Sequence, residues 1–123
     1  MILIDASVWI DHIREPDRAL SNLLLRDQVL THPFVIGEIA LGDLRSRDRV
    51  LDELQQLEIA EIASDPEVLR YIARYQLFGR GVGYVDVHLL ASTTLTDDCA
   101  LWTRDKRLRV VAEQLGAAAK GLN

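Results

Sequence analysis

The first seven residues place the strongest constraint on the fold of this chain. Ile2, Leu3 and Ile4 form a short apolar run, and Asp5 follows it directly. An unbroken apolar run of this length is typical of a strand buried on both faces, as in a parallel sheet. An ionised carboxylate at the end of such a strand is costly to desolvate without a partner. Because ligands gather beyond the carboxyl ends of parallel strands, Asp5 is either a helix cap or the first member of a site.

The bulk composition predicts one globular domain over residues 1–123. Hydrophobic residues make up 49% of the chain and charged residues 27%, and no apolar run approaches the roughly 18 residues of a membrane span. The first residues read as a strand rather than a signal peptide. Cys99 is the single cysteine, which excludes a disulfide framework and a cysteine zinc site and favours the cytoplasm. The net charge of -5 argues against binding nucleic acid through a uniformly basic surface, unless several acids are neutralised by metal.

Helical patterns alternate with short apolar runs along the whole chain, which predicts an α/β protein with a parallel sheet. Helices are expected at 6–14, 18–26, 33 to about 44, 48 to about 57, from 65 onwards, 84 to about 95 and 105–115, with short strands at 2–4, 29–30, 58–62 and 99–103. Asp65 is expected to cap the fifth helix, with Pro66 in its first turn. The segment 117–123 shows no clear strand pattern.

Three further carboxylates occupy unusual positions. Glu38 lies in the middle of a helix between apolar neighbours at helical spacing, which predicts that it faces the core, although it could also extend outwards at the edge of the apolar stripe. Asp86 lies in the first turn of the sixth helix. Asp105 follows the fourth strand, two residues after Thr103. Each of these two aspartates is either a helix cap or part of a site.

Taken together, the four acids indicate a metal site. Two end parallel strands, two lie on helices that should pack against the sheet, and four carboxylates in one place would repel each other without cations. Oxygen ligands without sulfur or paired histidines favour Mg²⁺ or Mn²⁺ over zinc. Such a pocket suits phosphoryl chemistry, because the metal activates water and neutralises charge on a phosphate. Ser7 and Thr103 either add hydroxyl contacts there or serve only as turn residues.

Four segments that contain these acids carry a family resemblance. They read LIDASVWID at 3–11, VIGEIALGDL at 35–44, YVDVHLLAS at 84–92 and LWTRDKRL at 101–108. With these motifs in this order, the chain resembles the PIN-domain ribonucleases, specifically the VapC-type toxins of toxin–antitoxin pairs. The match runs almost from end to end.

The resemblance implies a three-layer α/β/α sandwich with a central parallel sheet, formed by a single PIN domain over 1–123. It assigns catalysis and metal binding to Asp5, Glu38, Asp86 and Asp105, with Ser7 and Thr103 beside them. The implied activity is Mg²⁺-dependent hydrolysis of structured RNA, often tRNA or rRNA, which inhibits translation until an antitoxin neutralises the toxin. The implied partners are an RNA substrate, a cognate antitoxin and a second copy of the chain.

Basic residues near the acids are candidate substrate contacts. They are Arg80, Arg104, Lys106 and Arg107. Arginine suits phosphate recognition, but these positions could equally form a solvated helix start and a flexible turn. The leucine-rich second and fourth helices could leave a groove for an antitoxin helix or could simply form core.

Two other classes of function remain as alternatives. A phosphoryl-accepting receiver domain is disfavoured, because no aspartate follows the central strand near residues 58–62. The other alternative is a PIN domain that binds RNA or an antitoxin without catalysis. Because all four acids are present, nothing in the sequence favours it.

Overall fold

The computed structural model describes residues 1–123, which form four strands and seven helices. In chain order these are β1 (Ile2–Ile4), α1 (Ala6–Arg14), α2 (Arg18–Leu25), β2 (Val29–Thr31), α3 (Pro33–Ala40), α4 (Arg47–Gln55), β3 (Glu58–Ile59), α5 (Asp65–Tyr75), α6 (Tyr84–Leu95), β4 (Ala100–Trp102) and α7 (Lys106–Gln114). No helix combines the length and the apolar character that crossing a bilayer requires.

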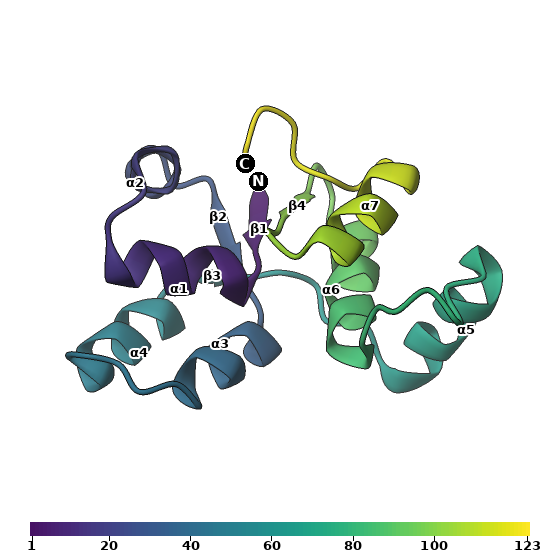
Figure 1. Ribbon diagram of the computed structural model, residues 1–123, viewed down its shortest axis with the longest axis horizontal. Coiled ribbons are helices and arrows are strands. Elements are labelled where there is room, and N and C mark those ends of the chain that lie inside the picture. Colours follow the sequence, from purple (N-terminus) through teal and green to yellow (C-terminus); the bar gives the residue numbers. More distant parts are fainter.

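The four strands form one parallel sheet in the order β3-β2-β1-β4. Helices α1 to α4 gather on one side of the strands and α5 to α7 on the other (Figure 1). Parallel strands need crossover helices, and right-handed crossovers place these helices over the sheet faces. The predicted α/β/α sandwich is confirmed.

The core is centred on β1, which has a strand on each side. Leu3 and Ile4 point to opposite faces of the sheet, and both side chains are fully buried. Both faces are therefore covered by helices, as the short apolar run predicts. Leu101 on β4 pairs with Leu3 and is also buried, so the sheet is fixed by apolar contacts on every side of β1. This arrangement holds the end of β1 rigidly.

Two element boundaries differ from the sequence prediction. Helix α3 ends at Ala40 rather than near residue 44, and the guanidinium of Arg47 donates two hydrogen bonds to the Ala40 carbonyl. These bonds satisfy a helix-end acceptor that a longer helix would have used. Strand β3, at one edge of the sheet, has only two residues rather than the predicted five, and both are exposed.

The start of α5 also differs from the prediction. Ser64, rather than Asp65, is the N-cap, and it forms a capping box with Glu67. The Asp65 side chain is therefore available for contacts with α6.

The segment after α7 returns to the sheet. The Leu101 backbone N–H donates to the Ala117 carbonyl at 2.7 Å, and the Ala119 N–H donates to the Leu101 carbonyl at 2.8 Å. A single parallel bridge joins Leu101 to Ala118. The pattern of residues 117–123 hides this contact because one bridging residue produces no periodicity.

His32 links α3 to α6 in the interior. Its Nδ1 accepts a hydrogen bond from the Phe34 backbone N–H at 3.0 Å, which requires the neutral tautomer protonated at Nε2. Nε2 lies 3.2 Å from the Ser92 hydroxyl and donates to it. The ring is fully buried, and burial, followed by the nearby His88, lowers the pKa of His32 to about 4.

The low pKa of His32 predicts a pH-dependent stability. Its contribution is complete above pH 6.5, where the unfolded state is also neutral, and is lost as the pH falls towards 4. Since one pKa unit corresponds to about 1.36 kcal/mol, the free energy of unfolding should fall by about 3 kcal/mol. Urea unfolding of the wild type and of His32→Asn between pH 4 and 7 measures it. Asparagine keeps an N-cap acceptor, and parallel pH profiles for the two proteins would contradict the assignment.

Candidate active site

Two of the predicted acids meet at the carboxyl edge of the sheet. β1 and β4 are parallel neighbours, with Ile4 opposite Trp102, so the residues after them lie side by side. The Asp5 backbone N–H donates to the Trp102 carbonyl at 2.9 Å and extends this pairing by one step. Asp5 therefore faces the segment 103–105 across the end of the sheet.

One oxygen of Asp5 is held by two hydroxyl groups. Ser7 Oγ and Thr103 Oγ1 each donate to Asp5 Oδ2 at 2.7 Å. Asp5 occupies the N-cap position of α1, but its side chain makes no capping hydrogen bond. The carboxylate therefore does not act as a helix cap. The side chain is buried, and Oδ1 receives no hydrogen bond from the protein. Asp5 thus has one fixed oxygen and one free oxygen.

Both hydroxyls are themselves oriented by the backbone. Ser7 Oγ accepts from the Arg104 N–H at 3.0 Å, and Thr103 Oγ1 accepts from the Asp105 N–H at 3.1 Å. Each relay runs from a peptide N–H through a hydroxyl to the same carboxylate oxygen. Such chains polarise their members and strengthen the final hydrogen bond to the anion. The relays keep Asp5 in a single orientation.

The other three acids lie around Asp5 in different environments. Asp105 is exposed and caps α7 through a 3.0 Å hydrogen bond from the Leu108 N–H. Asp86 is half-buried and accepts from the Gly83 N–H at 3.2 Å. Both aspartates therefore serve the caps that the sequence offered as alternatives, and each keeps one oxygen free of those bonds.

Of the two alternatives for Glu38, the structure shows the second, a side chain at the edge of the apolar stripe rather than in the core. Its residue is exposed, whereas Val35 and Ile39 form the buried stripe of α3. Because Glu38 directly precedes Ile39 on the helix, its side chain lies at the edge of that stripe.

The four carboxylates influence one another electrostatically. Burial, followed by the negative charges of Asp5 and Asp105, raises the pKa of Asp86 against the opposing Gly83 hydrogen bond. Glu38 is exposed as a residue, but partial desolvation of its carboxyl group, followed by the charges of Asp5 and Asp86, raises its pKa. Like charges disfavour ionisation only over short range. We call these four residues, Asp5, Glu38, Asp86 and Asp105, the acidic cluster.

The chemistry of the acidic cluster fits a hydrated hard cation. No three acidic, histidine or cysteine side chains in the structure lie close enough together to hold a metal ion among them. Mg²⁺ retains several waters and binds through one or two carboxylates, so an open set of oxygen donors is appropriate. A cation beside Asp5 Oδ1 would also offset the repulsion that, after burial, contributes to the raised pKa of Glu38 and Asp86.

Comparison with known proteins shows the family of this chain. The PIN domain family model matches residues 2–114. The chain belongs to the PIN-domain family. Two curated relatives, both named ribonuclease VapC32, come from Mycobacterium tuberculosis strains CDC 1551 / Oshkosh and ATCC 25618 / H37Rv. Each is 48% identical over 118 residues, covering 96% of this chain and 95% of the relative. The predicted resemblance to VapC-type PIN ribonucleases is confirmed.

The candidate substrate contacts of the PIN domain differ in whether a carboxylate pairs with their charge. The Arg104 guanidinium forms ion pairs with Asp11 at 2.8 Å and Asp17 at 2.7 Å. Arg80, Lys106 and Arg107 form no ion pair with a carboxylate. The Arg80 guanidinium donates to the Gln114 side chain, and Lys106 and Arg107 are exposed.

The side chain of Arg107 also packs against the loop before α6. Gly81 has a φ of +76°, and a Cβ there would lie 2.9 Å from Arg107 Nη1. Glycine at this position therefore permits both the turn and the close contact.

A buried histidine on α6 was not identified from the sequence as important. His88 is 2% exposed, and its Nε2 lies 3.2 Å from Asp65 Oδ1, which also accepts from the Tyr84 hydroxyl at 2.9 Å. The His88 ring contacts Phe34 edge-on, with centroids 4.7 Å apart. The spacing of Tyr84 and His88 by four residues was the available signal, but only the structure brings α5 and α3 to them.

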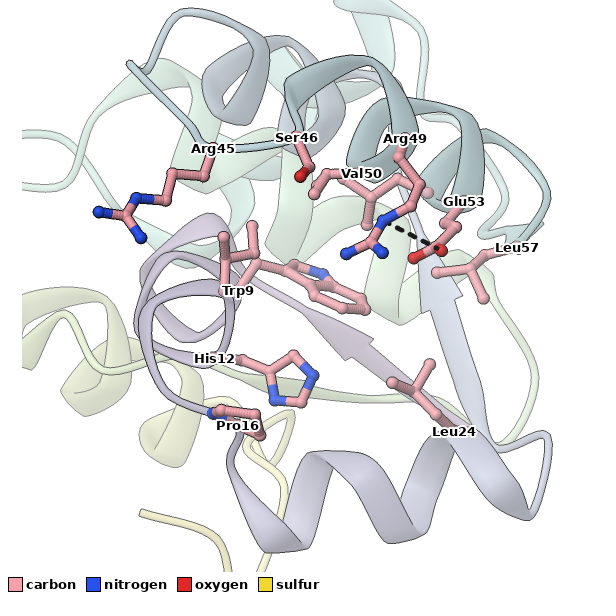
Figure 2. A pocket seen from close by; sticks show the side chains of 12 residues that line it. Trp9, His12, Pro16, Leu24, Arg45, Ser46, Arg49, Val50, Glu53 and Leu57 are labelled. Atoms are coloured by element: carbon pink, nitrogen blue, oxygen red, sulfur yellow. Dashed lines mark ion pairs between the residues drawn. The ribbon is translucent and has the colours of Figure 1, made fainter.

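A separate cavity of the PIN domain lies between α1, α2 and α4. Its volume is about 370 Å³. Trp9 and His12 of α1 face Val50 of α4 across it, and Leu24 of α2 closes one side (Figure 2). None of the acidic cluster lines this cavity. The leucine-rich helices thus leave a groove in addition to contributing core.

Removal of the Asp5 charge should lower the pKa of both Glu38 and Asp86, because that charge opposes their ionisation. The measurement is side-chain ¹³C carboxyl NMR on the metal-free Asp5→Asn protein. Asp97→Asn, which removes an exposed charge in the turn before β4, is the control and should leave both pKa values unchanged. Unchanged values in Asp5→Asn would show that the acids do not form one cluster.

Proposed function

We propose that this PIN domain is a metal-dependent endoribonuclease that acts as the toxin of a toxin–antitoxin pair. The observation that carries the proposal is the doubly held Asp5, which has one oxygen without a hydrogen bond and whose charge contributes to the raised pKa of both Glu38 and Asp86. The names of the two VapC32 relatives support RNA as the substrate and an antitoxin as the partner.

The acidic cluster would hold Mg²⁺ or Mn²⁺. When bound, the ion supplies Lewis acidity that activates a water and neutralises charge on the scissile phosphate. Ser7 and Thr103 fix Asp5, and Asp105 and Asp86 are fixed by the helix ends that they cap. Positional rigidity of this kind lowers the cost of assembling the reacting groups.

The substrate of the proposed reaction is structured RNA, in particular tRNA or rRNA, whose cleavage would stop translation in the cytoplasm. Arg80, Lys106 and Arg107 are the proposed phosphate contacts, because their charges are not paired with a carboxylate. Guanidinium groups bind phosphate oxygens in a planar, bidentate manner. These few cations act locally, on a chain of net charge -5.

Asp5→Asn should reduce cleavage of total tRNA and rRNA to the level seen with a metal chelator, because the amide loses the anionic ligand while still accepting the two hydroxyl hydrogen bonds. Gel analysis of the RNA with Mg²⁺ or Mn²⁺ measures it, with circular dichroism to check folding. Asp52→Asn, an exposed substitution on α4, should retain full activity. Wild-type cleavage by Asp5→Asn would refute the metal assignment.

The groove between α1, α2 and α4 is the proposed antitoxin site. Its half-buried Leu24 and Val50 offer apolar contacts, and the ion pair of Arg49 with Glu53 lies at its rim (Figure 2). An amphipathic helix that lays its apolar face into such a groove gains affinity from buried area. The proposed resting assembly also includes a second copy of the toxin, supported by exposed apolar side chains such as Leu41 and Leu69.

Val50→Asp should weaken binding of the protein encoded by the neighbouring reading frame by about tenfold or more, since a charge would be buried without a partner. Calorimetric titration of the two purified proteins measures the affinity. RNA cleavage by the free Val50→Asp protein should match the wild type, because Val50 lies outside the acidic cluster. Undiminished antitoxin binding would place the partner on another surface.

A further inference from the structure

The strongest polar network outside the acidic cluster is centred on the Arg104 side chain. Nη1 contacts Asp11 Oδ2 at 2.8 Å, near the end of α1, and Nη2 contacts Asp17 Oδ2 at 2.7 Å, at the N-cap of α2. Nε donates to the Asn123 carbonyl at 2.8 Å. The guanidinium also lies 5.4 Å from the centroid of the Trp102 ring. One side chain therefore connects four separate parts of the chain.

The Asp17 carboxylate is built into this network through both oxygens. Oδ1 accepts from the Leu20 N–H at 3.0 Å, and Oδ2 binds Arg104. The Leu20 hydrogen bond, and then Arg104, lower the pKa of Asp17, so it is ionised and can hold the guanidinium. Arg104 and Asp17 side chains are 27% and 24% exposed, in contrast to the other arginine ion pairs, which are more open to solvent.

The backbone of the same residue reaches the acidic cluster. The Arg104 N–H donates to Ser7 Oγ, which donates to Asp5 Oδ2. The Asp105 N–H donates to Thr103 Oγ1, which donates to the same Asp5 oxygen. The direction of these two N–H groups depends on how the segment 103–105 lies against α1. The Arg104 side chain ties this segment to α1 and to the N-cap of α2.

We propose that Arg104 is a positioning residue for the metal site. Its guanidinium anchors the segment 103–105 to Asp11 and Asp17, so that two consecutive backbone N–H groups orient Ser7 and Thr103, and these hydroxyls orient Asp5. Arginine suits this role because its planar fork engages two carboxylates at once, whereas the ammonium of lysine is a single point charge. The inference rests on the proposed function, in that the acidic cluster binds a divalent cation.

The alternative role for Arg104 is a direct contact with RNA phosphate. The two roles predict different results when the charges of Asp11 and Asp17 are removed. If Arg104 positions Asp5, removing the charges of Asp11 and Asp17 releases the segment and weakens metal binding. If Arg104 binds phosphate, the same removal frees a cation and strengthens RNA binding. Asparagine at 17 still caps α2 through its side-chain oxygen, so the helix start is kept.

The test is Mn²⁺ binding to the full antitoxin-free chain without RNA, measured by calorimetry and electron paramagnetic resonance. Arg104→Gln and the double variant Asp11→Asn/Asp17→Asn should each lose at least about tenfold in Mn²⁺ affinity, the size typical of groups that orient metal ligands. Arg104→Lys should fall between Arg104→Gln and the wild type. Arg109→Gln, which breaks the exposed pair with Glu113 on α7, is the matched control and should bind Mn²⁺ like the wild type.

A second readout follows the relays themselves. In the metal-free double variant, the Arg104 and Asp105 amides should exchange with solvent faster than in the wild type, while amides within β1 remain protected. This measurement needs neither metal nor activity, and it remains informative if Arg104→Gln is poorly folded.

The outcomes separate this inference from the proposed function. Wild-type Mn²⁺ affinity in Arg104→Gln and in the double variant, with only RNA affinity altered, overturns the positioning role and leaves the ribonuclease intact. A wild-type chain that binds Mn²⁺ but cleaves no RNA defeats the proposed function, and loss of Mn²⁺ affinity in the variants still supports the positioning role. A wild-type chain that binds no Mn²⁺ overturns both.

Discussion

The hydrogen bonds to Asp5 Oδ2 are the constraint on which the rest of the site depends. They exist because β1 and β4 are parallel neighbours that end at the same level, which places Ser7 and Thr103 on either side of one carboxylate. A buried carboxylate without such partners would be expensive. Here two hydroxyls and two peptide N–H groups support it, and the second oxygen remains free.

The same arrangement concentrates negative charge at one edge of the sheet. Burial, and then repulsion within the acidic cluster, raises the pKa of Glu38 and of Asp86. Such local strain is tolerated because the stability of the domain comes from the apolar core around β1, which is independent of the acids. Active sites commonly combine a rigid framework with groups that repel one another until a ligand binds.

Local sequence patterns were sufficient for much of the fold. The bounds of α1 and α6 could be predicted from apolar spacing and from the breaks that follow them, and the start of α3 from Pro33. The end of α3 could not, because it depends on Arg47, which returns to the Ala40 carbonyl from the next helix. The bridge at Ala118 also escaped prediction, since its only signal is contact with β4.

The sequence by itself determined the succession of strands and helices, and it predicted the four residues of the acidic cluster because each acid lies in a local motif at a strand end or on a helix. It did not determine their environments. Its local pattern left Glu38 either in the core or at the edge of the apolar stripe, and the structure places it exposed at the edge. Arg104 is held by Asp11 and Asp17, although its place beside Asp105 suggested a phosphate contact. These partners are separated by up to 93 residues. Only the tertiary structure brings them together, since burial and ion pairing depend on the packing of distant elements rather than on local order.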